Sequence, residues 1–315
     1  GPPGLTNVVN GKLYVTSGDI AGIGPEVVAK AITALDDDER SKLQVVDPGH
    51  CVKQLIGPSC SVDLVGLGDV IAYPGQDNKV AAQLAWEGLK FVADAVSAEQ
   101  SGAVATGPVH KGRLHEIGFP FPGQTEFFAD AWGGMPIMML SDGHLHVVPA
   151  TIHVALKQVP HMLNIDHLTQ LFLGTADAAR KHLGILSPRL AVCGLNPHAG
   201  EAGLFGFEES EIIMPAISKA MALDGKVMIF GPLAADSLFL PHIRTNYDVI
   251  IGMYHDQVLG PFKAISFADG VNATIGLPHL RVAPDHGTAD DIAGKNMAHP
   301  GPMLAAIRMG LKSLS

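Results

Sequence analysis

Short apolar runs alternate with amphipathic segments along most of the chain. Apolar runs bounded by Gly, Pro or charge predict buried strands at 12–17, 43–46, 103–106, 189–193, 226–230 and 248–251. Between them, apolar residues recur with helical spacing at 77–99, 166–183, 208–223 and 302–311. In 77–99 the apolar face comprises Val80, Leu84, Leu89, Val92 and Val96. Strands that alternate with helices predict an α/β protein with a mainly parallel sheet.

One pair of strands is expected to be antiparallel. The segments 137–140 and 144–148 are joined by Ser141-Asp142-Gly143, and Asp-Gly is typical of a hairpin turn. The Pro-rich segment 119–126 before them indicates a turn and a crossover between domains. The length of 315 residues agrees with two domains.

Composition narrows the class of protein. The chain is 47% hydrophobic and 17% charged, with a formal charge of −10. Its overall electrostatic field is therefore negative and does not attract nucleic acid or an anionic membrane surface. No apolar run is long enough to span a membrane. Residues 1–4 suggest a flexible leader. The three cysteines lack CxxC spacing, which favours a reduced, cytoplasmic protein with Cys193 in the core.

The Gly-rich loop at 18–24 follows the first predicted strand. Pro25 and Glu26 suit the first turn of a helix after this loop, as in a phosphate-binding unit. The spacing is not G-x-G-x-x-G and there is no Walker lysine, so a standard dinucleotide fingerprint is excluded.

Three histidines each follow a strand-like segment: His153, His198 and His255. Three imidazoles with open coordination positions would suit a catalytic divalent ion. The alternative is that each is an isolated polar loop residue, and spacing alone favours that alternative.

Lys263, Asn272 and Arg281 recur nine residues apart. A lysine and an arginine in an acidic chain would suit a phosphate or carboxylate, while the alternative is solvated surface charge. The apolar residues at 271–277 favour a lined pocket.

The segment 285–294 is Gly-rich and is expected to open a helix. Thr288 and Asp291 have the spacing of a capping box, which needs no ligand. A helix N-terminus could also bind a cofactor, and an acidic side chain there can bind a ribose 2′-hydroxyl, which favours NAD over NADP.

The chain resembles the 4-hydroxythreonine-4-phosphate dehydrogenase family, within the isocitrate/isopropylmalate dehydrogenase-like superfamily. The resemblance covers nearly the whole chain, through GDIAGIGPE, ATGPVHK, PGQTEFF, ATIH, LNPHAGE, GPLAADSLF, YHDQVLGPFK, GVNATIGLP and DHGTADDIAGK. It implies two α/β domains with a mostly parallel sheet, some antiparallel pairing and an active-site cleft between the domains. We expect the first domain at 1–125 plus 271–315, with the cofactor loop. The second is expected at 126–270, with the metal ligands and dimer contacts.

The resemblance also implies roles for individual residues. The metal (Zn, Co or Mg) would be held by His153, His198 and His255, drawn from both subunits of a homodimer. Substrate-binding positions fall on Gln124, Thr125, Lys263, Asn272 and Arg281. Cofactor-binding positions fall on His286, Gly287, Asp291 and Gly294, with NAD expected and NADP the alternative.

Position 124 departs from the family pattern, in which histidine usually precedes the threonine. Gln124 can donate or accept a hydrogen bond but cannot become cationic. Related proteins act on other phosphorylated sugar acids or on a terephthalate cis-dihydrodiol. The dihydrodiol group lacks the Thr-Glu pair kept here at 125–126, which favours a phosphorylated hydroxy acid.

The implied reaction is oxidation of the secondary alcohol of 4-phosphohydroxy-L-threonine by NAD, followed by decarboxylation. Asp236 and Asp256 are candidates for proton handling or for orienting ligands. The alternatives are a dehydrogenase of another sugar acid or diol, and a non-catalytic metabolite-binding protein of the same fold.

Overall fold

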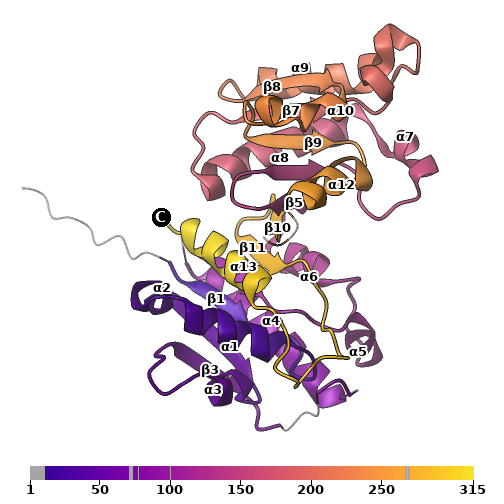
Figure 1. Cartoon of the computed structure of the whole chain (residues 1–315). Helices are drawn as coiled ribbons and strands as arrows, with labels where there is room; N and C mark the ends of the chain where they lie inside the picture. Colours follow the sequence, from indigo (N-terminus) through magenta and orange to yellow (C-terminus); the bar gives the residue numbers. More distant parts are fainter. Residues whose placement is uncertain (1–10, 71–73, 77, 100, 267, 269) are drawn as a thin grey trace, which may run out of the picture. The chain divides into compact units, whose positions relative to one another are not determined.

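The chain forms two compact units. The computed structural model describes residues 11–70, 74–76, 78–99, 101–266, 268 and 270–315. One unit extends to Trp132 and resumes at His279, and the other spans Gly133–Pro278. The boundaries expected from the sequence were 125/126 and 270/271. The proposed leader at 1–4 lies outside the described residues. Figure 1 labels most of the elements of both units.

The first unit contains a parallel sheet, as the alternation of strands and helices predicted. Its strand order is β3 (Asp63–Leu67), β2 (Leu43–Pro48), β1 (Leu13–Thr16), β4 (Ala103–Thr106) and β11 (Leu280–Pro284). Each neighbouring pair is parallel. β1 and β4 are buried along their whole length, because both faces of the sheet are covered by helices.

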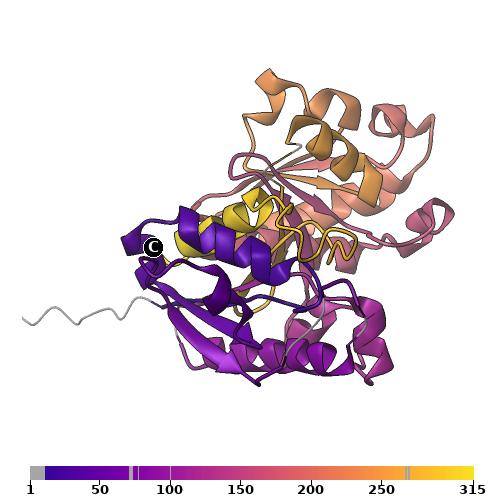
Figure 2. The same ribbon diagram turned by 60° about the horizontal axis from the view of Figure 1, so that its bottom comes forward.

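Helices cover both faces of this sheet. Figure 2 shows α1 (Gly24–Ala34) and α13 (Gly301–Lys312) on one face and α4 (Lys79–Ser97) on the other. The shorter helices are α2 (Asp37–Ser41), α3 (Cys51–Leu55), α5 (Lys111–Glu116) and α6 (Gln124–Trp132). α1 begins where predicted, with a proline in its first turn.

The long helix α4 shows how local sequence sets an element. Asn78 caps it, because the Asn78 Oδ1 accepts hydrogen bonds from the backbone N–H groups of Val80 and Ala81. Leu84, Leu89, Val92 and Val96 are buried, as predicted. Val80, placed on the same apolar face by its spacing, lies in the first turn and remains 50% exposed.

The second unit contains a mixed sheet. Its order is β10 (Val271–Ile275), β5 (Ile137–Ser141), β6 (His146–Pro149), β9 (Val249–Gly252), β7 (Arg189–Cys193) and β8 (Met228–Leu233). β5 is antiparallel to both β10 and β6, and the predicted Asp-Gly turn joins β5 to β6. In that turn the Asp142 Oδ1 accepts from the backbone N–H groups of His144 and Leu145. The strands β6, β9, β7 and β8 are parallel.

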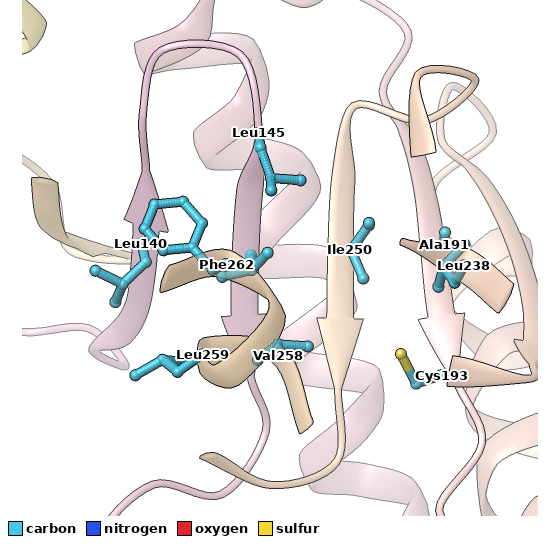
Figure 3. Packing of buried hydrophobic residues seen from close by; sticks show 10 residues of the cluster. Leu140, Leu145, Ala191, Cys193, Leu238, Ile250, Val258, Leu259 and Phe262 are labelled. Carbon is cyan, nitrogen blue, oxygen red and sulfur yellow. The ribbon is translucent and has the colours of Figure 1, made fainter. Parts of the chain in front are cut away.

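The helical elements of the second unit include several that the sequence did not predict. They are η1 (Leu156–Gln158), α7 (Val159–Met162), α8 (Ile165–Leu183), the turn η2 (Pro197–Gly203), the π-helix η3 (Glu209–Ile213), α9 (Met214–Leu223), α10 (Ala235–Leu238), α11 (Pro241–Arg244) and α12 (His255–Ile265). The longest of the unpredicted helices is α12, which contains Pro261. Figure 3 shows three of its side chains, Val258, Leu259 and Phe262, among strand residues such as Leu140 and Ile250.

The cysteines follow the prediction. All three are free thiols. Cys193 is completely buried in the core of the second unit, and burial raises the pKa of its thiol to about 12. Within the described parts of the chain, none of the helices has the length and apolar character needed to cross a membrane.

The packing of α12 generates a stability prediction. Phe262 is 1% exposed, so Phe262→Ala should lower the free energy of unfolding by about 3–5 kcal/mol through lost burial and a cavity. Ile265→Ala in the same helix is the control, because Ile265 is 40% exposed. Denaturant unfolding measures both. Equal losses in the two variants would contradict the assigned core.

Candidate active site

The three predicted histidines follow three neighbouring parallel strands. His153 follows β6, His255 follows β9 and His198 follows β7, and β9 lies between the other two. The carboxyl ends of parallel strands meet at the same edge of a sheet, where ligands bind in open α/β sheets. Asp236 follows β8 at the same edge, in the first turn of α10.

Two side chains connect these strand ends. The Thr151 hydroxyl after β6 donates to the Met253 carbonyl after β9, at 2.8 Å. The Gln257 amide joins β9 to β7, because its Oε1 accepts from the Met253 N–H at 2.7 Å and its Nε2 donates to the Gly194 carbonyl at 2.8 Å. These hydrogen bonds therefore connect the bases of the three loops that carry the histidines.

His153 and His255 are brought together. Their ring centroids are 5.7 Å apart, and both line a cavity of about 370 Å³ together with Tyr254 and Asp256. The remaining lining residues are apolar: Ile152, Val154, Leu156 and Val159. Nδ1 of His255 lies 2.7 Å from Oδ1 of Asp256. An ionised carboxylate only accepts, so this contact assigns the ring proton to Nδ1 and leaves the Nε2 lone pair for a ligand.

His198 does not join the other two within one chain. Among the residues that the structure describes, no three His, Cys, Asp or Glu side chains lie close enough to hold a metal ion. His198 lies on the exposed turn η2, where residues 198–202 all have positive φ. The structure therefore places two of the three predicted ligands in one cavity and the third elsewhere.

The predicted anion-binding residues divide between the two units. Lys263 is exposed in the last turn of α12, and Asn272 is half-buried in β10. Gln124, Thr125 and Arg281 belong to the other unit, with the first two opening α6 and the third in β11.

Arg281 is a buried cation held by polar neighbours. It is 6% exposed, and desolvation lowers the pKa of its guanidinium to about 10 against the opposing influence of Glu126. Its Nε donates to the Thr106 hydroxyl at 3.0 Å, and its Nη2 donates to Oε1 of Gln124 at 3.1 Å. Nε2 of Gln124 in turn donates to the Gly107 carbonyl at 3.2 Å. Both ends of the Gln124 amide are thus used, and a neutral residue adds no second cation beside Arg281.

An aromatic cluster fixes the entry to α6. Phe119, Phe121 and Phe127 pack with centroid distances of 5.4 Å, 5.7 Å and 6.2 Å. Phe127 and Phe128 also pack together, and Phe128 contacts Trp132. Because Gln124 and Thr125 lie inside this cluster's span of sequence, their backbone is held by apolar packing on both sides.

The predicted cofactor segment does not open a helix. His286 and Gly287 precede a series of turns at 290–296, Asp291 and Gly294 are exposed within these turns, and the next helix, α13, begins only at Gly301. The expected capping box is therefore absent. The Thr288 carbonyl instead accepts a hydrogen bond from the Ile23 N–H at 2.9 Å, and Ala289, Gly294 and Asn296 have positive φ, which interrupts a helix.

A buried arginine that the sequence did not single out holds this segment. Arg113 is 3% exposed and pairs with both Asp290 and the completely buried Asp19, the latter at 3.4 Å. It connects the Gly-rich loop at 18–24 with the segment 285–296. No local signal marks Arg113, because its partners lie far away in the sequence.

A fold of two α/β units with polar residues at the carboxyl ends of parallel strands is typical of α/β enzymes. The family described as pyridoxal phosphate biosynthetic protein PdxA matches residues 19–310. The 4-hydroxythreonine-4-phosphate dehydrogenase of Erythrobacter litoralis is 40% identical, over 94% of this chain and 95% of that protein. The chain belongs to the PdxA family.

Solved structures agree with this assignment. The crystal structure of 4-hydroxythreonine-4-phosphate dehydrogenase from Klebsiella pneumoniae is 32% identical and covers 98% of this chain and 99% of that one, with a TM-score of 0.84. A terephthalate 1,2-cis-dihydrodiol dehydrogenase from Burkholderia xenovorans is 27% identical over 96% of this chain and 97% of that one, with a TM-score of 0.72. Isocitrate dehydrogenase from Methylococcus capsulatus, 13% identical over 95% of this chain and 84% of that one at a TM-score of 0.50, shares the fold alone. The predicted fold class is confirmed.

The Arg113 contacts generate a prediction. Arg113→Met leaves the buried Asp19 without its cation, so the free energy of unfolding should fall by about 3–5 kcal/mol. Amide hydrogen exchange should also become faster across 285–296. Arg308→Met is the control, because Arg308 pairs with Glu39 at an exposed site and such pairs contribute less than about 1 kcal/mol. Unchanged exchange across 285–296 in Arg113→Met would contradict the role given to Arg113.

Proposed function

We propose that the chain is an NAD-dependent and divalent-metal-dependent dehydrogenase of 4-phosphohydroxy-L-threonine in pyridoxal phosphate biosynthesis. The secondary alcohol loses a hydride to NAD and a proton from its hydroxyl, giving a 3-oxo acid. That acid loses carbon dioxide and gains a proton to give 3-amino-2-oxopropyl phosphate. The observation that supports this most is the pair of His153 and His255, with Asp256, in one cavity at parallel strand ends of a PdxA-family chain.

The donor set fits a divalent metal. Asp256 binds Nδ1 of His255, an arrangement in which a carboxylate orients an imidazole so that Nε2 can bind a metal. Imidazole ligands favour zinc or cobalt over magnesium. When bound, the metal supplies Lewis-acid stabilisation of the negative charge that develops on the substrate oxygen.

The third ligand is proposed to come from a second copy of the chain. His198 is exposed and lies apart from the pair formed by His153 and His255. Apolar side chains near it are also exposed, including Leu204 at 72% and Phe207 at 59%, as expected for a surface covered by another subunit. A homodimer in which His198 completes the partner's site accounts for both observations. We also propose that the protein is cytoplasmic.

The remaining residues are proposed to hold the substrate, the cofactor and protons. Arg281 and Lys263 would bind the phosphate, with Thr125, Asn272 and Gln124 as neutral partners. Asp256 would orient His255, and Asp236 would accept or return a proton. The segment with His286, Gly287, Asp291 and Gly294 would bind NAD, and an exposed Asp291 favours it over NADP through a ribose hydroxyl.

Two alternatives remain within the same fold. One is a dehydrogenase of another 4-phosphorylated sugar acid, such as threonate or erythronate phosphate, or of an aromatic cis-dihydrodiol, which the terephthalate dihydrodiol dehydrogenase resemblance favours. The other is a non-catalytic metabolite-binding protein, against which the retained histidines, Lys263 and Asp291 argue. NADH absorbance with each candidate substrate separates them: turnover of 4-phosphohydroxythreonine alone supports the proposal, and turnover of only another substrate contradicts it.

Mixing inactive variants tests the shared metal site. His198→Ala and His255→Ala should each be inactive, but denatured and refolded together they should recover about a quarter of the wild-type activity. When equal amounts are refolded, half of the dimers contain one chain of each variant. Each of these dimers has one complete metal site out of two. NADH formation measures the recovery.

The matched control is a mixture of His153→Ala with His255→Ala. These two histidines lie in the same cavity of the same chain, so no mixed dimer has a complete site and activity should stay absent. Recovery in this control, or no recovery in the first mixture, would contradict the arrangement.

A substitution at position 124 tests the buried cation. Gln124→Glu places a carboxylate against Arg281 and neutralises the charge proposed to bind phosphate. The KM for the phosphorylated substrate should rise by about tenfold or more, a loss of about 1.4 kcal/mol in binding. Gln54→Glu, at an exposed position in α3, adds the same charge elsewhere and should leave KM unchanged. Equal KM values for all three proteins would contradict the role of Arg281.

A further inference from the structure

The turn that carries His198 has an unusual backbone. Residues 198–202 have φ values of 53°, 50°, 84°, 44° and 55°, so the chain makes a left-handed turn. Four of these residues have side chains: His198, Ala199, Glu201 and Ala202. L-residues visit this region singly at a cost in free energy, and a consecutive series persists only when surrounding contacts impose it.

A buried carboxylate supplies those contacts. Glu209, in the π-helix η3, is 4% exposed. Its Oε1 accepts from the Asn196 N–H at 2.7 Å, and its Oε2 accepts from the Asn196 side-chain amide at 3.1 Å. Both oxygens therefore bind the residue from which the turn starts. π-helical turns are often found at functional sites.

The turn closes directly over this carboxylate. A Cβ added to Gly200, which has φ 84°, would lie 2.9 Å from Oε2 of Glu209. A Cβ added to Gly194, at the end of β7, would lie 2.7 Å from Cα of Ala199 and 3.3 Å from Oε1 of Glu209. The two glycines thus leave room for the backbone of the turn to pack against Glu209.

The base of the turn is also joined to the strand end that carries His255. The Gly194 carbonyl accepts from Nε2 of Gln257, which lies two residues after His255. Glu209 therefore fixes the turn at its centre, while Gln257 fixes its base to the strand end that carries His255.

We propose that Glu209 is a positioning residue for His198. It holds the left-handed turn through Asn196 and Gly200 so that the His198 imidazole is presented to a divalent metal. Glu209 does not touch the metal, since its two oxygens are engaged by Asn196 and buried beneath the turn. The inference rests on the proposed function, in which His198 is a metal ligand.

Cobalt affinity in a double-mutant cycle tests this role. The proteins are the wild type, Glu209→Gln, His198→Ala and the double variant, and Co²⁺ binding is titrated through its visible absorption. In Glu209→Gln one acceptor becomes an amide that faces the Asn196 amide, so the turn should lose its support. The dissociation constant should rise by about tenfold to a hundredfold.

The decisive comparison is in the His198→Ala background. Because Glu209 acts through His198, Glu209→Gln should there change the dissociation constant no further. Equal fold-changes with and without His198 would show a general structural effect and overturn the inference. Glu211→Gln, at an exposed neighbour in η3, is the control and should bind Co²⁺ like the wild type.

A second variant covers the case in which Glu209→Gln does not fold. Gly200→Ala adds a Cβ against Oε2 of Glu209 and disfavours the positive φ, so it disturbs the same contact from the other side. It should give the same loss of affinity, again only when His198 is present. Wild-type affinity in Gly200→Ala would overturn the inference.

The outcomes separate this inference from the proposed function. If His198→Ala weakens Co²⁺ binding but Glu209→Gln does not, the metal site stands and the role of Glu209 is wrong. If the wild type binds no Co²⁺, the proposed function is contradicted and the inference with it.

Discussion

The parallel alignment of β6, β9 and β7 is the constraint on which the candidate site depends. Parallel pairing brings the carboxyl ends of the three strands to one edge, and each strand is followed within a few residues by a histidine. Hydrogen bonds from Thr151 and Gln257 then connect the loops at their bases. The apolar packing of α12 maintains the alignment, since Val258, Leu259 and Phe262 lie among the buried strand residues and the same helix begins with His255.

The first unit contains two buried arginines whose charges are stabilised in different ways. Arg281 and Arg113 are both buried cations, and each is retained through polar contacts that offset part of its desolvation. Arg113 pairs with carboxylates and holds a loop, whereas Arg281 donates hydrogen bonds to the neutral oxygens of Thr106 and Gln124 and has Glu126 as an anionic neighbour. The contacts of Arg113 support a structural role, and binding of the substrate phosphate is proposed for Arg281.

The sequence predicted the features that depend on local pattern. The Asp-Gly hairpin, the histidines after strands and eight of the strands follow from periodicity and position, whereas β3, β10 and β11 were not predicted. Features set by distant contacts were not predicted. The segment 286–294 has the composition of a helix start, but the Thr288 carbonyl is bound by the Ile23 N–H and the helix does not form. The left-handed turn at His198 and the carboxylate of Glu209 beneath it likewise depend on three-dimensional packing. The expectation that the three histidines come from both subunits rests on the family resemblance, because no spacing along one chain could indicate it.

The most direct test of the central claim is a crystal structure of the assembled protein grown with Co²⁺, with anomalous differences recorded at the cobalt edge. The account predicts one strong peak per chain, bound by His153 and His255 of one subunit and by His198 of its partner. A peak ligated by residues of a single subunit, or one that excludes His198, would contradict it.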